Sequence, residues 1–584
     1  MTLAMRSPMG SQAATDVLDT EQALNRRLRD LRKISTRLKS AKMTPLQVCQ
    51  AIIENRLLDC ESREFFADLP HDEKHYWVAS LYALLMPKGR RRRLAVYFTP
   101  PQLAEHAIDA LIEAGIDPCK HRVLDPASGG AAFLAPLAGR IASDLKMHGS
   151  DSHSILETIE SRLEGIEIEP HLTQLSQLLL ADLLHDEIAD AGRDLQVPIR
   201  RTNALKLYEP ERRFDAIIGN PPYGRVFRPS KEVLTRFAPV ITDGYVNLYA
   251  LFIEHAIRWV RPGGIICLIV PTSFIGGPYF GALRKRMLQS TQIQRIDPID
   301  KRSDVFLDVL YDVCNLVLKK KKGGERPTLA TSSILRVGEK PRVLGCIDLP
   351  QSPNKRVWGL PDGVLDDQLF HESLETLGDY GYITRTGYFV WNREQHRYRT
   401  GFKPRTTEVP LYWAHNVRAN RVCTPLDGEY GSQRIGFVKI SNSSSAIVCT
   451  DALLLQRTTN RRQKRRLVVG MIREKRVPGD RGFVCENHTI LVLPDPDRPQ
   501  RVSLTTLCRL LNTAAVDGRF RRISGSVSVS TKALRDLPLP AASAVSSAFV
   551  SGVAAEEAAY EAYVASLKRT GPNVRKPKKP LGAT

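Results

Sequence analysis

The sequence predicts an α/β protein with several domains, and three features carry this prediction. The chain has 584 residues, 42% of them hydrophobic, which exceeds one ordinary core and supplies apolar side chains for two or three. Strand-like and helix-like segments alternate from a break at residues 87–93 to about Lys319, as is typical of a parallel sheet with helices on both faces. Farther on, short aromatic and β-branched runs separated by Gly, Asn and Pro indicate a mixed α+β domain.

We divide the chain into four parts on this basis. Residues 1–88 are charged and carry leucines at helical spacing, which predicts a helical N-terminal region. Residues 89–345 form the large α/β domain and residues 346–540 the mixed domain. Residues 541–584 begin with an Ala-rich helix and end in a basic, proline-containing tail that we expect to be disordered.

The charge of the chain indicates a polyanionic partner. It has 84 Lys and Arg against 63 Asp and Glu, a net charge of +21, and nucleic acid is the commonest partner of proteins this basic. No run of 18 apolar residues and no secretory pattern occur, so we expect a soluble intracellular protein that binds no membrane. The ten cysteines include no Cys-x-x-Cys pair, so we expect reduced, mostly buried thiols and no metal site.

Two predicted strands end in acidic residues at positions that suit a nucleotide-like cofactor. Residues 123–134 run from an apolar strand through Asp125 into a turn of small residues and then a helix, where backbone N–H groups can meet a ligand. Residues 163–170 form a second such strand, and Glu167 at its end could accept hydrogen bonds from both hydroxyls of a ribose. Each pattern alone also fits a capped glycine turn or an exposed carboxylate, so the prediction rests on the pair.

The most informative segment is residues 214–224, an apolar strand that runs into Asn-Pro-Pro-Tyr. Two prolines remove backbone donors and stiffen the chain where the strand ends. The amide oxygen of Asn220 and the carbonyl of Pro221 can together accept both hydrogens of a planar amino group, which returns electron density to its nitrogen for attack on a methyl sulfonium. Tyr223 offers a ring on which a base can stack, worth about 1–3 kcal/mol. A turn followed by a core tyrosine is the alternative interpretation.

With these motifs in this order, the chain resembles the gamma-class N6-adenine DNA methyltransferases that carry a TaqI-like or Eco57I-like specificity domain. The resemblance covers residues 97–540 and implies a Rossmann-like S-adenosylmethionine-dependent methyltransferase domain followed by a DNA target-recognition domain. It implies catalytic roles for Asn220, Pro221, Pro222 and Tyr223, with the target base stacked between Tyr223 and Phe306. The cofactor contacts that it implies are Thr99, Asp125, Ala127, Gly129, Glu167 and Asn203.

The chain departs from the family pattern at two positions. Many relatives have Gly-x-Gly in the turn after the first strand, whereas this chain has Gly129-Gly130-Ala131. Alanine tolerates a positive φ poorly, so we expect a different loop or weaker cofactor binding. At the end of the third strand, Asn203 stands where the family usually has an acid, so its contact with the cofactor loses a charge.

The predicted reaction is methyl transfer from S-adenosylmethionine to N6 of an adenine flipped out of double-stranded DNA, by direct displacement. The sequence argues against C5-cytosine chemistry, because that reaction needs a thiol at the ring and Cys119, in the one Pro-Cys pair, precedes the cofactor strand. N4-cytosine methylation and, more distantly, protein glutamine N5-methylation use the same physics and remain alternatives. The N4-cytosine methyltransferases usually have Ser or Asp before the prolines. The protein glutamine methyltransferases have a compact catalytic domain without a long basic extension.

The resemblance also sets expectations about partners and location. We expect a monomeric enzyme of the prokaryotic or phage-infected cytoplasm, associated with the nucleoid, that modifies DNA in a restriction-modification or phage-defence system. The N-terminal region shows no nuclease-like cluster of carboxylates and lysine, so we do not expect this chain to cleave DNA. Whether a separate restriction endonuclease accompanies it stays an open question. The basic runs at residues 90–93 and 461–466 have two interpretations, contact with DNA phosphate and solvated surface, and we give the two equal weight.

Overall fold

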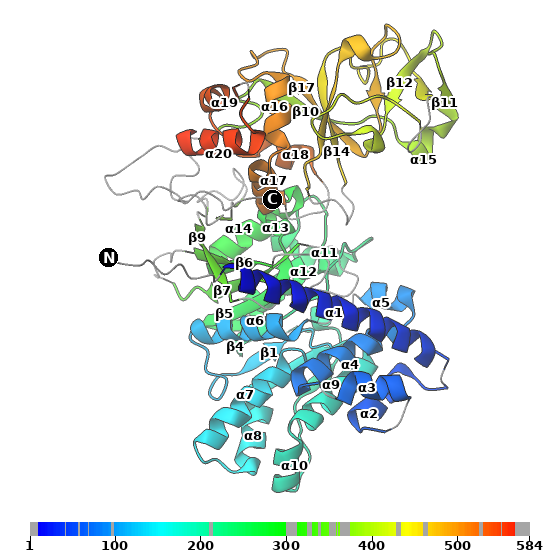
Figure 1. The fold of residues 1–584 in the computed structure, drawn as a ribbon. Coiled ribbons are helices and arrows are strands. Elements are labelled where there is room, and N and C mark those ends of the chain that lie inside the picture. Colours follow the sequence, from blue (N-terminus) through cyan, green and yellow to red (C-terminus); the bar gives the residue numbers. More distant parts are fainter. Residues whose placement is uncertain are drawn as a thin grey trace, which may run out of the picture. The chain divides into compact units, whose positions relative to one another are not determined.

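The structure of the protein is a computed structural model in which two compact units are distinguished (Figure 1). Unit 1 comprises Met1–Phe274 and Tyr279–Val343, and unit 2 comprises Ile275–Pro278 and Leu344–Thr584. The residues described are 10–40, 42–56, 59–67, 69–94, 99–208, 214–299, 312–323, 330–336, 340–347, 349, 358, 360–361, 374–427, 434–458, 465–524, 529–550 and 552–566. The four-part division made from the sequence is finer than these two units and stays a prediction.

Among the described residues, a nine-stranded sheet organises unit 1, with strand order β3-β2-β1-β4-β5-β7-β6-β8-β9. Its strands are β1 (Val123–Asp125), β2 (Leu163–Glu167), β3 (Ile199–Arg201), β4 (Phe214–Gly219), β5 (Val260–Pro271), β6 (Thr291–Pro298), β7 (Val313–Lys320), β8 (Ala330–Ile334) and β9 (Arg342–Ile347). The sheet lies between helices, as the alternating sequence pattern predicts.

Strand direction in this sheet differs from the expected all-parallel arrangement. Strands β1 to β5 pair parallel, but β7 lies between β5 and β6 and is antiparallel to both. The sequence did not predict this because β7, like β5, is an apolar run buried on both faces, and burial carries no direction. Since β1, β2 and β4 are parallel, their carboxyl ends lie at one edge of the sheet, where Asp125, Glu167 and Asn220 are found.

The helices of unit 1 mostly connect these strands. They are α6 (Pro101–Glu113), α7 (Leu134–Met147), α8 (Ser152–Arg162), α9 (Pro170–Leu183), α10 (His185–Ala191), η1 (Ala204–Lys206), α11 (Lys231–Arg236), η2 (Ala238–Val240), α12 (Leu248–Trp259) and α14 (Gly281–Ser290). The short helices α13 (Ser273–Gly276) and η3 (Pro278–Phe280) each contain a boundary between the units.

The N-terminal helices belong to unit 1, and two of them, α2 and α4, pack on α9. They are α1 (Gly10–Leu38), α2 (Pro45–Ile53), α3 (Cys60–Ala67), α4 (His71–Leu85) and α5 (Lys88–Leu94). Helix α2 begins with a capping box between Thr44 and Gln47 and has Pro45 in its first turn, both strong start signals. Val48, Trp77 and their neighbours share one hydrophobic core with leucines of α9, and α2, α4 and α9 lie side by side (Figure 1).

Unit 2 has the mixed α+β architecture that the sequence predicts. Two four-stranded sheets are described, with orders β10-β17-β14-β15 and β11-β13-β12-β16. Their strands are β10 (Tyr382–Thr386), β11 (Tyr398–Gly401), β12 (Glu408–Tyr412), β13 (Ile435–Lys439), β14 (Ala452–Gln456), β15 (Val469–Ile472), β16 (Val484–Cys485) and β17 (Thr489–Pro494). The helices are α15 (Trp391–Glu394), η5 (Gln395–Arg397), η6 (Ala414–Asn416), η7 (Glu474–Arg476), α16 (Leu504–Leu511), α17 (Ala514–Ser524), α18 (Thr531–Arg535), α19 (Ala542–Ala548) and α20 (Ala555–Ser566).

Strand β14 shows how the core of unit 2 is divided. Leu453 and Leu455 point into a core shared with helices α16 to α20, whereas Leu454 points into a second core with Tyr412 and Phe483. This alternation follows from the two-residue period of a strand. The first sheet of unit 2 is therefore buried on both faces.

All ten cysteines are free thiols, and six of them are buried. Cys60 in unit 1 and Cys449 in unit 2 are the two exposed ones. No helix within the described part of the chain is long and apolar enough to span a bilayer.

Candidate functional site

Asp125 ends β1 with its carboxylate buried and only partly satisfied. The residue is 1% exposed, and its Oδ1 accepts a hydrogen bond of 3.0 Å from the backbone N–H of Ala127. Its Oδ2 is buried and has no hydrogen-bond partner among the described residues. Burial, with a smaller contribution from the charge of Glu167, raises the pKa of Asp125 to about 8. A buried carboxylate with one unpartnered oxygen suits a ligand that brings a positive charge or a hydrogen-bond donor.

Two residues that the sequence analysis did not single out shape the surroundings of Asp125. A Cβ at Gly219, the last residue of β4, would lie 2.8 Å from Asp125 Oδ1, so only glycine leaves this carboxylate in place. The Oγ of Ser128 is buried without a hydrogen-bond partner in the described part of the chain. Only the glycine directly before the Asn-Pro-Pro-Tyr segment offered a sequence signal for this packing.

The loop after β1 is held against the end of β2. The N–H of Gly129, at φ +53°, donates to Oε2 of Glu167 over 2.9 Å, and its carbonyl accepts a 2.5 Å bond from the Ser176 hydroxyl. Ala131 is fully buried and adopts φ +59°, the left-handed conformation that disfavours alanine. Ala131 therefore adopts the left-handed conformation at the cost of strain, and the loop does not avoid that conformation.

Glu167, at the end of β2, is buried and accepts backbone hydrogen bonds. Besides the bond from Gly129, its Oε1 accepts the N–H of Glu169 at 2.7 Å, and burial raises its pKa. The Glu167 carbonyl also accepts the N–H of Thr202 at 2.9 Å, which ties the end of β3 to the same edge. The neighbouring Asn203 uses its Oδ1 to accept the N–H of Leu205 at 3.0 Å and so caps η1.

Asn220 follows β4 directly, and the amide of its side chain is fixed from both ends. Its Nδ2 donates to Oγ1 of Thr99 over 3.1 Å, and its Oδ1 accepts the hydroxyl of Tyr223. Thr99 is buried just before α6, so the hydrogen bond joins two segments that are 121 residues apart. The structure therefore brings the predicted cofactor residue Thr99 to the predicted catalytic amide.

Tyr223 is mostly enclosed by protein. The residue is 8% exposed, and the single proton of its hydroxyl is shared between two acceptors, the carbonyl of Ile269 in β5 at 3.1 Å and Oδ1 of Asn220. Burial raises its pKa well above the ordinary value, so the phenol stays neutral and remains a donor. Pro221 is buried and Pro222 half-buried beside it. Phe306, the other predicted stacking residue, lies outside the described residues.

A cavity of ≈ 210 Å³ adjoins this group of residues. Its lining includes Thr99, Glu105 of α6, residues 130–132 of the loop after β1, and His75 of α4. The cavity is not lined by Asp125, Glu167 or Asn220, although all three were predicted to lie at one ligand site. The cavity meets the site through Thr99, the partner of Asn220, and through the loop whose Gly129 is bonded to Glu167.

Several arginines expected to contact phosphate are used within the protein. Arg90 donates to both carboxylate oxygens of Glu169 at 2.9 and 3.0 Å. Arg466 is buried, and Arg465 bonds to the Glu556 carboxylate at 2.7 Å. The phosphate interpretation is wrong for Arg466, because a buried guanidinium does not reach a DNA backbone. The rest of that run, residues 461–464, lies outside the described residues.

Part of the chain that carries these residues matches a family model. The model of the Eco57I restriction-modification methylase family matches residues 162–306, which include Glu167 and the Asn-Pro-Pro-Tyr segment. Unit 1 has the fold of an S-adenosylmethionine-dependent methyltransferase domain. The buried Asp125 Oδ2, which has no partner among the described residues, fits this cofactor, because the ammonium and sulfonium groups of the cofactor are cationic. The loop after β1, whose Gly129 is bonded to Glu167, fits a nucleoside-containing ligand.

Relatives of the methyltransferase domain are Type II methyltransferases. M.BsuBI of Bacillus subtilis is 23% identical over 77% of this chain and 88% of its own length. M.TthHB8I of Thermus thermophilus is 28% identical over 41% of this chain, which spans only 48% of that relative. Among solved structures, the Type IIL restriction-modification enzyme MmeI in complex with DNA has a TM-score of 0.52 and 13% identity, with 98% of each chain covered. This likeness extends the shared fold along almost the entire chain.

Proposed function

We propose that the chain is a site-specific DNA methyltransferase that methylates N6 of adenine. The observation that carries the proposal is the Asn-Pro-Pro-Tyr corner at the end of β4, where Thr99 holds the amide of Asn220 in a fixed orientation. The names of the relatives, Type II methyltransferases, support DNA as the substrate. The choice of adenine over cytosine rests on the asparagine that precedes the two prolines.

The proposed chemistry needs two acceptors for one amino group. Asn220 Oδ1 and the carbonyl of Pro221 accept its two hydrogens, so the nitrogen lone pair becomes available for attack. Asn220 Oδ1 accepts the Tyr223 hydroxyl in the structure, so the adenine amino group replaces that hydroxyl when it binds. Thr99 keeps the amide from rotating during this exchange. S-adenosylmethionine, when bound, supplies the methyl group, and the protein contributes chiefly by positioning.

The proposed cofactor contacts lie on both sides of the loop after β1. Asp125, with Ala127 and Gly129, holds the methionine end, where its unpartnered oxygen meets a positive charge. Glu167 accepts hydrogen bonds from the ribose. Thr99 and Asn203 complete the set of cofactor contacts. Asn203 contacts the cofactor through its amide nitrogen, because its amide oxygen caps η1.

Access to the amino group requires the adenine to leave the helix. A base inside a duplex cannot reach a pocket at the edge of the sheet, and flipping costs a few kcal/mol. Stacking between Tyr223 and Phe306, at about 1–3 kcal/mol per contact, offsets that cost. Double-stranded DNA is the proposed partner of this basic chain. The chain acts as a monomer, and any restriction endonuclease of the same system is a separate protein.

The proposal is tested by expressing the chain in a host free of DNA methylation and sequencing its DNA by a single-molecule method. The expected result is N6-methyladenine within one defined sequence motif. Asn220→Ala is expected to abolish the mark while the purified variant still binds DNA. Methyl groups on cytosine N4, or on a protein glutamine in place of DNA, would contradict the proposal and support one of the two alternatives.

A further inference from the structure

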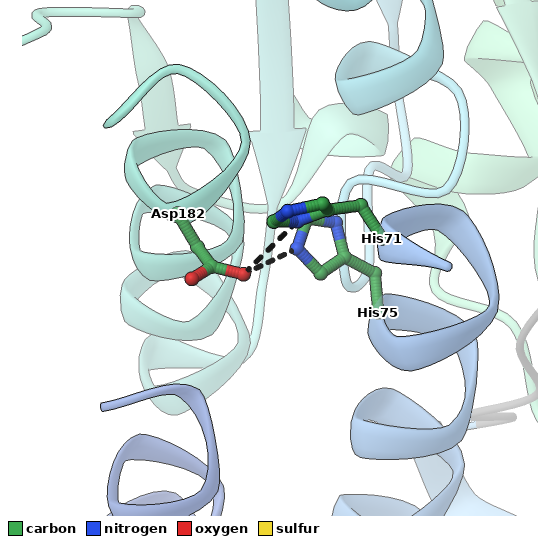
Figure 2. A group of neighbouring side chains, drawn as sticks. All are labelled: His71, His75 and Asp182. Atoms are coloured by element: carbon green, nitrogen blue, oxygen red, sulfur yellow. Dashed lines mark hydrogen bonds and ion pairs between the residues drawn. The ribbon is translucent and has the colours of Figure 1, made fainter. Parts of the chain in front are cut away.

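Two histidines and an aspartate converge between α4 and α9 (Figure 2). His71 and His75 are four residues apart on α4, so both side chains leave the same face of the helix. Asp182 comes from α9 and points at both rings (Figure 2). We infer that His71, His75 and Asp182 form a binding site for a divalent transition metal ion of the Zn²⁺ class.

The spacing of the donor atoms suits such an ion. Nε2 of His75 lies 2.9 Å from Oδ2 of Asp182, and Nδ1 of His71 lies 3.6 Å from the same oxygen. All three ligand atoms lie within 4.8 Å of one another. Tetrahedral Zn²⁺ with bonds of 2.0–2.2 Å places its donors roughly 3.3 Å apart, a value between the two observed distances. Only small side-chain adjustments separate the observed arrangement from a metal site.

The donor types select the class of metal. Two imidazole nitrogens with one carboxylate suit Zn²⁺, Co²⁺ or Ni²⁺, whereas Mg²⁺ and Ca²⁺ prefer sites made only of oxygen. The His71 side chain is 61% exposed and that of His75 only 9%, so the ion can arrive from solvent and bind against a buried ligand. Three protein ligands leave a fourth position for water.

One neighbouring cation competes with a metal ion for Asp182. The ammonium of Lys74 lies 3.9 Å from Oδ2 of Asp182 and competes with a metal ion for that oxygen. Replacing this lysine with an uncharged side chain should strengthen metal binding.

The position of the site gives the ion a structural role. Helix α4 belongs to the N-terminal helices, and α9 begins directly after Glu169, next to the proposed ribose-binding carboxylate. His75 also lines the cavity that Thr99 and the loop after β1 border. A bound ion would fasten α4 to α9 and stabilise the folded chain, because it binds the native arrangement and not the unfolded one.

The test uses the full-length protein, stripped of metal with a chelator and titrated with Zn²⁺ by calorimetry and with Co²⁺ by absorption spectroscopy. We expect one equivalent to bind and to raise the melting temperature. His75→Ala and Asp182→Asn should each weaken binding more than about 100-fold, since even partners outside the ligand set change affinity about 10–100-fold. Because His71 is exposed, His71→Ala should fold normally and still lose affinity. Lys74→Met should bind more tightly.

His185→Ala is the matched control. His185 is also a histidine beside an acid in the same unit, 3.5 Å from Asp186, but its side chain is 81% exposed and it lies outside the cluster. The control should bind Zn²⁺ like the wild type. Absence of a stoichiometric Zn²⁺ or Co²⁺ complex, or equal affinities of His71→Ala and His185→Ala, would overturn the inference.

Discussion

At the residue scale, the raised pKa of Asp125 predicts that cofactor binding depends on pH. With a pKa of about 8, the carboxylate is protonated in the free protein at neutral pH, and a cationic cofactor binds the ionised form better. Affinity for S-adenosylmethionine should therefore increase as the pH rises toward 8 and level off above it, by at most about 10-fold per pH unit. Calorimetric titrations at several pH values measure this dependence.

The matched variant for this prediction is Asp125→Asn. It removes the titrating group, so it should bind the cofactor weakly with an affinity that does not follow this pH dependence.

The stability of the folded protein should depend on pH with the opposite sign to cofactor affinity. Because the pKa of Asp125 is raised in the folded state, its contribution to the free energy of unfolding decreases as the pH rises from about 4 to 8. A wild-type affinity that decreases over the same interval would exclude an ionised Asp125 as the ligand.

Thr99 should affect the rate more than cofactor binding. In Thr99→Val the Nδ2 of Asn220 loses its acceptor, at a cost of about 1–3 kcal/mol for a buried donor, so kcat should decrease about 5- to 150-fold. Thr99→Ser retains the hydroxyl and should restore most of the rate. Steady-state kinetics with DNA and cofactor separate the two roles. If only the KM for the cofactor changes, Thr99 contacts the cofactor and does not orient the amide.

Tyr223 should matter through its ring more than through its hydroxyl. Tyr223→Phe removes the hydroxyl that occupies Asn220 Oδ1 but keeps the ring, so methylation should continue within a few-fold of the wild-type rate. Tyr223→Ala removes the stacking face and should lower kcat/KM by the equivalent of about 1–3 kcal/mol. Equal losses in the two variants would show that the hydroxyl, with its bond to Ile269, is what matters.

The sequence predicted which residues end the strands but not how their side chains pair. The positions of Asp125, Glu167 and Asn220 follow from strand ends, because parallel strands share a carboxyl edge. The bond between Thr99 and Asn220 joins residues 121 positions apart, and nothing in either local pattern encodes it. The capping role of Asn203 could have been predicted, since an asparagine before a short helix is a common N-cap.

At the scale of elements, the loop between β1 and α7 carries strain at Ala131. Ala131→Gly should raise the free energy of unfolding by about 1 kcal/mol, because glycine adopts a positive φ without penalty. The adjacent Ala132 is the control: its φ is not positive, so Ala132→Gly should be neutral or destabilising. Urea denaturation measures both. A destabilised Ala131→Gly would show that the buried methyl group contributes more than the strain costs.

Elements were predicted best where local signals were strong. Leucines at helical spacing predicted that the N-terminal region is helical, and apolar runs bounded by turns predicted β1, β2 and β4. The antiparallel direction of β7 could not be predicted, because an apolar run shows burial and not orientation. The packing of α2 and α4 on α9 was also missed, since it depends on leucines more than eighty residues farther along the chain.

At the scale of the whole molecule, a net charge of +21 predicts salt-dependent DNA binding. If six to ten phosphates are contacted, affinity should decrease about 10³- to 10⁵-fold between 50 and 200 mM salt. Fluorescence anisotropy with a labelled duplex measures the slope for the wild type and for Asn220→Ala, which should coincide. A salt-independent affinity would mean that the excess charge lies away from the DNA.

The order of strand-like and helix-like segments predicted an α/β part followed by a mixed α+β part, and the two units have these architectures. It could not predict that unit 2 contains two four-stranded sheets, because their strands pair over long stretches of sequence. Burial of both faces of β14 is likewise a tertiary property, since alternate leucines of one strand enter different cores.

The pattern of thiol exposure has a practical consequence. The six buried cysteines are shielded from reagents, while Cys60 and Cys449 are exposed, one in each unit. Maleimide fluorophores added to the natural sequence should therefore attach first at these two positions, with Cys60 reacting more slowly because Glu64 raises its pKa. A donor and acceptor pair introduced in this way would report by energy transfer how the two halves of the enzyme respond when a duplex binds.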